Sequence, residues 1–132
     1  QFLDTKAAAY TMVAYMMEAV GMDFSDAETF YVAGAFGTYL DKESAVTIGL
    51  YPDLPRDRIV SAGNTSLEGA RRLLCDRTIW DGLDRILDTM EYVQFGEVAN
   101  FIDRMAAAKA IPHTDLSRYP SVRKKLMARG LL

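Results

Sequence analysis

The sequence twice places a short apolar segment directly before a glycine turn, and this repeat limits the fold more than any other feature. Thr29 to Ala33 is the first segment, and it runs into Gly34 and Gly37. Residues 58–62 are the second segment, and they run into Gly63. A helical pattern follows each turn, so the sequence predicts two strand–glycine–helix units of an α/β protein. In such proteins ligands bind beyond the carboxyl ends of the strands, where glycine lets a ligand approach the backbone.

Length and composition agree with one domain of this class. The chain has 132 residues, 50% of them hydrophobic and 25% charged, which is enough for one globular core. A net charge of −3 supplies no basic field for nucleic acid. No apolar run approaches the roughly 20 residues that span a bilayer. We therefore expect a protein that binds neither nucleic acid nor membrane, and the single cysteine, which excludes an intrachain disulfide, fits a reducing, cytoplasmic setting.

Helical patterns surround the two strand segments. A long helix is predicted from about Asp4 to Val20, where Gly21 ends it. One face of this helix carries Ala8, Met12, Tyr15 or Met16, and Ala19. Phe24 is the buried anchor of the polar connection that follows. A second helix begins at Asp41, a capping residue, and stops before Pro52.

The second half of the chain is predicted to be mostly helical. Asn64 to Ser66 cap a helix through Cys75, in which Gly69 and Ala70 offer a smooth face for close packing. The next helix runs from Thr78 to Met90 and is expected to turn four side chains inward: Trp80, Leu83, Ile86 and Leu87. Tyr92 and Val93 are candidates for a short strand.

The C-terminal third begins with apolar residues at helical spacing. Phe95, Val98, Phe101, Ile102 and Met105 predict a helix to about Lys109. Residues 110–132 form a predicted tail, extended from His113 to Tyr119 and followed by a short basic helix from Val122 to Ala128.

Three sequence blocks resemble a known family. They are residues 33–37 (Ala-Gly-Ala-Phe-Gly), residues 45–53 (Ala-Val-Thr-Ile-Gly-Leu-Tyr-Pro-Asp) and residues 63–70 (Gly-Asn-Thr-Ser-Leu-Glu-Gly-Ala). In this order and spacing they resemble the C-terminal part of the reductive activators of corrinoid-dependent methyltransferases, from about Lys6 to Ile102. The resemblance implies an ATPase-like core of the acetate and sugar kinase, Hsp70 and actin superfamily (ASKHA), which is ribonuclease H-like.

On this resemblance, residues 1–132 are a single domain and the C-terminal segment of a longer protein, a view that the start at Gln1 favours. The chain would be the second half of the ATPase-like core, with a short sheet, flanking helices and a helical C-terminal cover. The implied parent couples ATP to the reduction of a Co(II) corrinoid to Co(I). It uses ATP or ADP, with Mg²⁺, and an iron–sulfur cluster that lies outside this chain.

The resemblance also implies partners and limits. The partners are a corrinoid protein and the remainder of the ATPase domain, and a homodimer is allowed. Because this half of the core supplies the adenosine side of the nucleotide cleft, the chain alone is not expected to be catalytic or to hold a metal. Its single cysteine excludes a cysteine-ligated iron–sulfur cluster built by this chain alone.

The family pattern assigns the cofactor-binding residues one by one. The adenosine-motif turn matches Gly34, Ala35, Phe36 and Gly37, and a second turn near the same edge matches Gly63 and Asn64. A structural explanation stands beside each assignment: a tight turn that requires glycine for residues 34–37, and a helix cap for Asn64.

Other polar residues have simpler interpretations than chemistry. We expect Asp41 and Glu43 to be charges at a helix start rather than a metal or base pair, and Asp53 to be a turn residue. His113 is expected to be a surface or tail histidine, and Cys75 a buried, inert thiol. Two other functions stay open: a non-catalytic interaction or dimerisation module, and another ASKHA enzyme, either a small-molecule kinase or a dehydratase activator.

Overall fold

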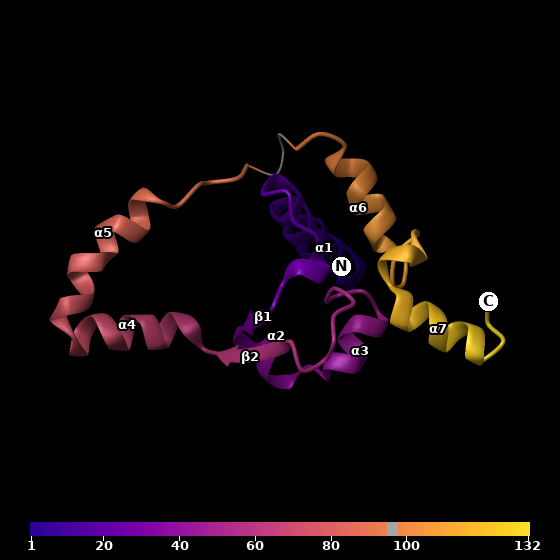
Figure 1. Ribbon diagram of the computed structural model, residues 1–132, viewed down its shortest axis with the longest axis horizontal. Helices are drawn as coiled ribbons and strands as arrows, with labels where there is room; N and C mark the ends of the chain where they lie inside the picture. The colour runs from indigo at the N-terminus through magenta and orange to yellow at the C-terminus, as the bar shows by residue number, and fades with distance from the viewer. Residues whose placement is uncertain (95–97) are drawn as a thin grey trace.

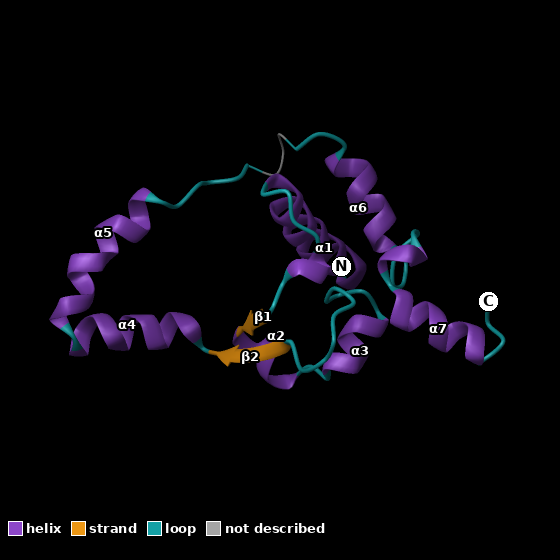
Figure 2. Cartoon of the chain, in the orientation of Figure 1, coloured by secondary structure: helices purple, strands orange, loops and turns teal. Residues whose placement is uncertain are grey.

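A computed structural model describes residues 1–94 and 98–132, with the side chain of Phe36 also outside the description. The helices and strands follow in the order α1 (Phe2–Ala19), β1 (Phe30–Ala33), α2 (Gly34–Tyr39), α3 (Lys42–Thr47), β2 (Ile59–Gly63), α4 (Thr65–Cys75), α5 (Trp80–Asp88), α6 (Phe101–Lys109) and α7 (Pro120–Ala128). Short 3-10 helices lie at Phe24–Asp26, Arg77–Ile79 and Leu116–Arg118. Helices surround one small sheet, which confirms the predicted α/β class (Figure 2).

The sheet consists of two parallel strands, β1 and β2. Phe30 pairs with Ile59, and a register shift near the strand ends pairs Ala33 with Gly63. Both predicted strands are therefore confirmed to within one residue at each end. Because the strands are parallel and in this register, both glycine turns leave the sheet at the same edge.

The hydrophobic core lies where α1, α3, β2, α6 and α7 meet. Its buried residues are Ala7, Tyr10, Ala14, Ala45, Val46, Tyr51, Leu54, Ile59, Ala108, Tyr119 and Val122. Phe24 packs against this cluster, with its ring centroid 5.8 Å from that of Tyr10, as the sequence predicted.

The C-terminal segment is part of this core. The Tyr119 side chain is fully buried, and its hydroxyl donates to the carbonyls of Gly49 and Tyr51 at 3.3 and 3.2 Å. Residues 113–119 were expected to be extended, but they contain the 3-10 helix Leu116–Arg118 and this buried anchor. The predicted basic helix is confirmed as α7, which begins two residues early at Pro120, a residue suited to a first helical turn.

The long helix α1 forms as predicted but buries a different face. Its buried residues are Lys6, Ala7, Tyr10, Thr11 and Ala14, whereas Met16 is exposed. Apolar residues surround most of this helix, so their spacing could not select one face. The Lys6 ammonium donates to three backbone carbonyls at the end of α6, those of Ala108, Ala110 and Pro112. Burial of the Lys6 side chain lowers its pKa to about 8.

Helices α4 and α5, with residues 89–94, form an arm that extends away from the core and then returns towards the end of α1 (Figure 1). The structure describes every residue of α4 and α5, and none is buried. The prediction that Trp80, Ile86 and Leu87 point inward is wrong, since their exposed fractions are 54%, 55% and 55%. An amphipathic pattern marks a face that can be buried, but it does not say where the covering surface lies.

Three smaller predictions concern the arm and its connection to α6. The described chain has no strand at Tyr92 and Val93. The expected close packing at Gly69 is wrong, because a Cβ built there meets no heavy atom of the described residues within 4 Å. The helix predicted to end at Lys109 is confirmed as α6, but it begins only at Phe101, so Val98 precedes it, while Phe95 lies outside the described residues. Within the described ranges, no helix is long and apolar enough to cross a membrane.

Candidate functional site at the glycine edge

The predicted nucleotide-contact residues all lie at the carboxyl edge of the sheet. We call Gly34, Ala35, Phe36, Gly37, Gly63 and Asn64 the glycine edge. The structure brings its two segments together because Ala33, the last residue of β1, is the register partner of Gly63. The sequence prediction that both turns share one edge is thus met by the geometry.

Gly34 and Gly63 share the same local conformation. Their φ angles are +73° and +63°, in the left-handed region that favours glycine. A Cβ added at either position would meet no heavy atom of the described residues within 4 Å. Backbone conformation therefore requires glycine here, while the surrounding space stays open to a ligand.

Gly37 has a different role. A Cβ at this position would lie 2.0 Å from the carbonyl oxygen of Val32, so α2 can fold back against the end of β1 only if residue 37 is glycine. The segment expected to be a turn is the short helix α2, in which Ala35 is exposed. The Phe36 side chain lies outside the described part of the chain.

Asn64 is the N-cap residue of α4. Its Oδ1 accepts a hydrogen bond of 3.0 Å from the backbone N–H of Leu67. This contact confirms the capping interpretation. It uses only the side-chain oxygen, so the side-chain NH₂ takes no part in the cap. Because Asn64 is the N-cap residue, the N-terminus of α4, which is the positive end of its helix dipole, also lies at the glycine edge.

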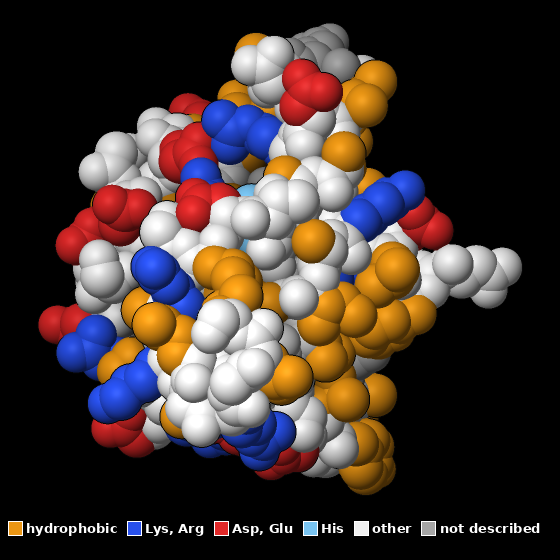
Figure 3. All heavy atoms as spheres, turned by 90° about the vertical axis from the view of Figure 1, so that its right-hand side faces the viewer, with side chains coloured by type: hydrophobic (Ala, Val, Ile, Leu, Met, Phe, Trp, Pro, Cys, Tyr) orange, Lys and Arg blue, Asp and Glu red, His pale blue; other side chains and the backbone are white. Residues whose placement is uncertain are grey.

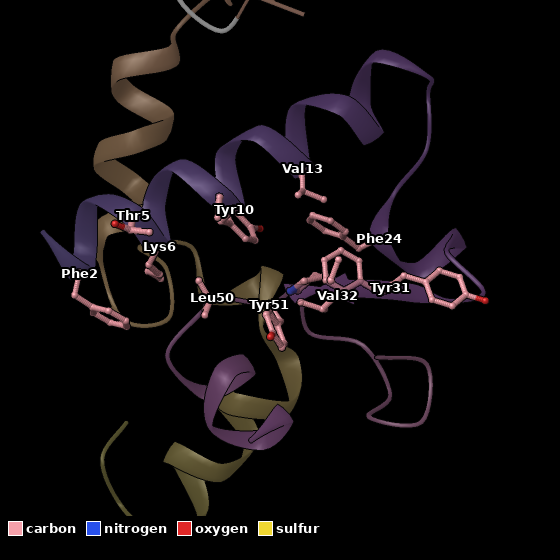
Figure 4. Close-up of a pocket in the computed structure, with 14 residues that line it drawn as sticks. Phe2, Thr5, Lys6, Tyr10, Val13, Phe24, Tyr31, Val32, Leu50 and Tyr51 are labelled. Atoms are coloured by element: carbon pink, nitrogen blue, oxygen red, sulfur yellow. The ribbon is translucent and has the colours of Figure 1, made fainter. Parts of the chain in front are cut away.

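An apolar cavity of about 360 Å³ lies next to this edge, between α1 and β1. In Figure 4, Tyr10 and Val13 approach it from α1, and Leu50 and Tyr51 approach from the opposite side. The Tyr31 ring points away from it, and 69% of this residue is exposed. The cavity reaches Ala33, but none of the glycine-edge residues, as far as they are described, lines it. Sequence reasoning missed this cavity because its lining is spread over four separate segments.

The acidic candidates have structural roles around Arg56. Arg56 donates to Glu43 through Nε at 2.9 Å and to Asp53 through Nη1 at 3.1 Å. Hydrogen bonds from Arg56, and then from Lys125, lower the pKa of Glu43 to about 2. Asp41 caps α3, as predicted, by accepting from the backbone N–H of Ser44 at 2.8 Å.

Asp53 does more than its predicted turn role. Its side chain is 3% exposed, and Oδ2 accepts from the backbone N–H of Ser121 at 2.6 Å. Asp53 therefore caps α7, which follows far along the chain. No local sequence signal could show this contact, since Asp53 and Ser121 meet only after folding.

The single cysteine contradicts its prediction. Cys75 is exposed at the end of α4, not buried, because the arm does not pack on the core. His113 is half-buried against the Tyr10 ring, with centroids 5.4 Å apart.

Comparisons with known proteins agree with the resemblance found in the sequence. The family model described as the C-terminal domain of RACo, the ASKHA domain, matches residues 1–123. The corrinoid activation enzyme RamQ of Eubacterium limosum is 39% identical over 72 residues, which are 54% of this chain and 12% of that protein. The Co(II) methylated amine-specific corrinoid protein reductase of Methanosarcina barkeri is 36% identical over 83 residues, 61% of this chain and 15% of that protein.

A solved structure gives the same result for the fold. The reductive activator for corrinoid, iron-sulfur protein superposes with a TM-score of 0.83 and 35% identity, over 91% of this chain and 19% of that chain. The chain thus spans between 12% and 19% of the length of these relatives. The match over residues 1–123 and the shared fold lead to one conclusion: this chain belongs to the family of the C-terminal ASKHA domain of RACo.

Proposed function

We propose that the glycine edge forms the adenosine side of an ATP cleft in a corrinoid reductive activator. The observation that carries this proposal is the pairing of Ala33 with Gly63, which sets two glycine turns side by side. Gly34 and Gly63 leave open space where any other residue would place a Cβ. A flat ligand and its sugar can approach backbone atoms at such a place.

The residues present fit a nucleotide better than they fit the other expected cofactor. Gly34 and Gly63 would lie against the nucleotide, and Asn64 would contribute an amide beside them. ATP would supply the free energy of its binding and hydrolysis, and its phosphate and Mg²⁺ contacts would come from the other half of the core. An iron–sulfur cluster does not fit this chain, which has one cysteine, because such clusters are held by several thiolates.

The names of the relatives support the wider role. One relative is a corrinoid activation enzyme, one is a reductase of a Co(II) corrinoid protein, and one is a reductive activator for a corrinoid, iron-sulfur protein. We infer that this chain serves the ATP-coupled reduction of Co(II) to Co(I) in such a system. Its partners would be a corrinoid protein and the remainder of the ATPase domain, in the cytoplasm.

An amide NMR titration with ADP and then ATP tests the nucleotide site. The proposal expects saturable shifts at Gly34, Gly37, Gly63 and Asn64, and little change at Gly130, a distant glycine with a similar φ of +68°. Absence of shifts both in this chain and in a longer protein that contains the whole ATPase domain would refute it. Shifts in the longer protein alone would show that the cleft needs both halves.

The arm favours a second candidate function, a non-catalytic interaction or dimerisation module. Leu74 and Trp80 are 88% and 54% exposed, although both are large apolar residues on a described, well-formed helix pair. Such surfaces mark sites of protein contact. Analytical ultracentrifugation of the wild-type chain and of Leu74→Glu tests this function. A dimer that the substitution disrupts, together with indifference to nucleotide, would favour the interaction module over the ATP cleft.

A further inference from the structure

A second cavity, of about 340 Å³, lies between α1, α6 and residues 113–118. It shares only Tyr10 with the apolar cavity, and no described residue of the glycine edge lines it. Its lining is polar, with two arginines, a histidine and a threonine among its residues. We call it the polar cavity. On the face shown in Figure 3, the histidine is the small pale-blue area, largely covered by neighbouring atoms.

Thr11 is the most unusual residue of this lining. It is 2% exposed, and its Oγ1 has no hydrogen-bond partner among the described residues. A threonine within a helix commonly bonds a carbonyl one turn earlier, but Thr11 does not. A buried hydroxyl without a partner destabilises the folded state. A polar ligand in the cavity would remove that cost.

His113 offers a second donor. Its Nδ1 accepts a hydrogen bond of 2.9 Å from the backbone N–H of Asp115, so the neutral imidazole carries its proton on Nε2. Burial, with the nearby charges of Arg118 and Lys6, lowers the pKa of His113. The ring is therefore neutral near pH 7 and presents a fixed N–H.

Two guanidinium groups line the same cavity. Arg104 donates to Glu18 at 2.7 Å, while Arg118 Nε lies 3.7 Å from the Asp115 carboxylate. Each guanidinium has five N–H donors, more than one carboxylate can use. The Arg118 contact with Asp115 is too long for a strong hydrogen bond. Arg118 also donates to the Tyr10 hydroxyl, which still leaves several of its five N–H donors for a ligand. One acidic side chain in the lining, Asp103, opposes these charges.

The start of α6 adds to the excess of donors. Asn100, the N-cap residue, lines the cavity with a φ of 58° and makes no side-chain capping bond to any described residue. The nine-residue helix α6 therefore directs the positive end of its dipole to this region without a side-chain cap.

We propose that the polar cavity binds a small oxyanion, the carboxylate of an organic acid or a phosphate group, through Thr11, His113 and Arg118. The Thr11 hydroxyl and the His113 Nε2–H donate to the anion, and Arg118 supplies the compensating charge. Asp103 limits the positive charge of the cavity, which favours a monoanion over a dianion. This site is separate from the glycine edge and does not depend on the nucleotide proposal.

An amide and imidazole NMR titration with sodium acetate and, separately, inorganic phosphate tests the proposal. The pH is fixed near neutrality, and sodium chloride keeps the ionic strength constant. We expect saturable shifts at Thr11, Asn100 and His113 at millimolar ligand, with Gly34 and Gly63 unaffected. Stronger binding of acetate would identify an organic acid, and stronger binding of phosphate would identify a phosphate group. No saturable shift with either anion would overturn the proposal.

Two variants establish where the anion binds. Thr11→Val keeps the shape of the side chain and removes the unpartnered hydroxyl, so the fold is retained while binding weakens about tenfold. Arg118→Gln removes the charge at a partly exposed position and weakens binding at least as much. Thr89→Val, on the arm, is the matched control and leaves binding unchanged. Shifts that persist at wild-type affinity in both cavity variants would also overturn the site.

Discussion

Ala33 and Gly63 are register partners across the parallel sheet, although they belong to different strand–glycine–helix units. The pairing places the first residues of α2 and the N-cap of α4 at neighbouring positions. Each unit alone is a common local pattern, but the pair makes a shared edge with two left-handed glycines.

Substitutions at three glycines should have three different effects on the free energy of unfolding. Gly37→Ala places a Cβ 2.0 Å from the Val32 carbonyl oxygen and should cost at least about 2 kcal/mol. Gly34→Ala has free space but a φ of +73°, so about 1 kcal/mol is expected. Gly69→Ala, in an exposed part of α4, should stabilise by up to about 1 kcal/mol. Urea unfolding measures all three, and equal losses for Gly37→Ala and Gly34→Ala would contradict the close approach at Val32.

Two substitutions of Asn64 distinguish its capping role from contact with a nucleotide. Asn64→Ala removes the acceptor for the Leu67 N–H and should cost about 1 kcal/mol. Asn64→Asp keeps an acceptor, so its stability should stay close to that of the wild type. If the amide contacts the nucleotide, Asn64→Asp should nevertheless weaken the ADP-dependent shifts. Wild-type shifts in Asn64→Asp would leave capping as the role of this residue.

Loss of the Asp53 carboxylate should loosen the C-terminal helix. Asp53→Ala removes hydrogen bonds to Ser121 and Arg56 from a site that is almost fully buried, so a loss of about 2–3 kcal/mol is expected. Hydrogen exchange within α7 should accelerate. Asp41→Ala is the control: it removes an exposed cap and should cost only about 1 kcal/mol, without a change in α7.

Stability should rise with pH above about 8 because of Lys6. Burial lowers its folded-state pKa from 10.5 to about 8, so the unfolded chain binds more protons in this interval. The free energy of unfolding should therefore increase between about pH 8 and pH 10, by at most about 3 kcal/mol. Burial raises the pKa of Tyr10 and Tyr119 above the usual value of 10.0. Their ionisation therefore lowers the free energy of unfolding as pH rises, but only above the interval in which Lys6 titrates.

Lys6→Met is the control for this pH dependence. It should be less stable at neutral pH, because three carbonyls lose their shared donor, and its stability should not rise over the same interval. Urea unfolding at several pH values measures both proteins. A rise of equal size in Lys6→Met would assign the effect to another group.

Cys75 should react with a thiol reagent in the folded protein. The residue is exposed at the end of α4, so its rate with Ellman's reagent should be close to the rate in urea. Strong protection in the folded state would show that the arm packs against the remainder of the chain in solution.

The sequence predicted elements more successfully than it predicted their packing. The strands and α1, α3 and α4 follow from local signals such as Asp41, Asn64 and the glycines, which act within a few residues. The buried face of α1 could not be predicted because apolar residues surround most of the helix, and because a lysine is not an expected core residue. Lys6 is buried only because carbonyls from the distant end of α6 surround its ammonium.

The candidate site also divides into features that local sequence signals predict and features that depend on the tertiary fold. The positions of the glycine edge could be predicted because parallel strands bring their carboxyl ends together. The polar cavity could not be predicted, since Thr11, Arg104 and His113 lie on three segments whose meeting depends on the tertiary fold. The burial of Cys75 was predicted wrongly for a related reason: nothing in the pattern of α4 shows that its apolar side lacks a partner.

The exposed arm also has an energetic consequence. Neither α4 nor α5, both fully described, contributes a residue to the core, so the arm is held together by its own local contacts. These are the Asn64 cap, the pairs of Glu68 with Arg71 and Arg72, and the Trp80 hydrogen bond to Leu73. Because exposed contacts of this kind are weak, the arm can unravel without opening the core. We therefore expect the arm and the core to unfold as two cooperative units, and a partner that binds the arm would stabilise α4 and α5 beyond what their own contacts provide.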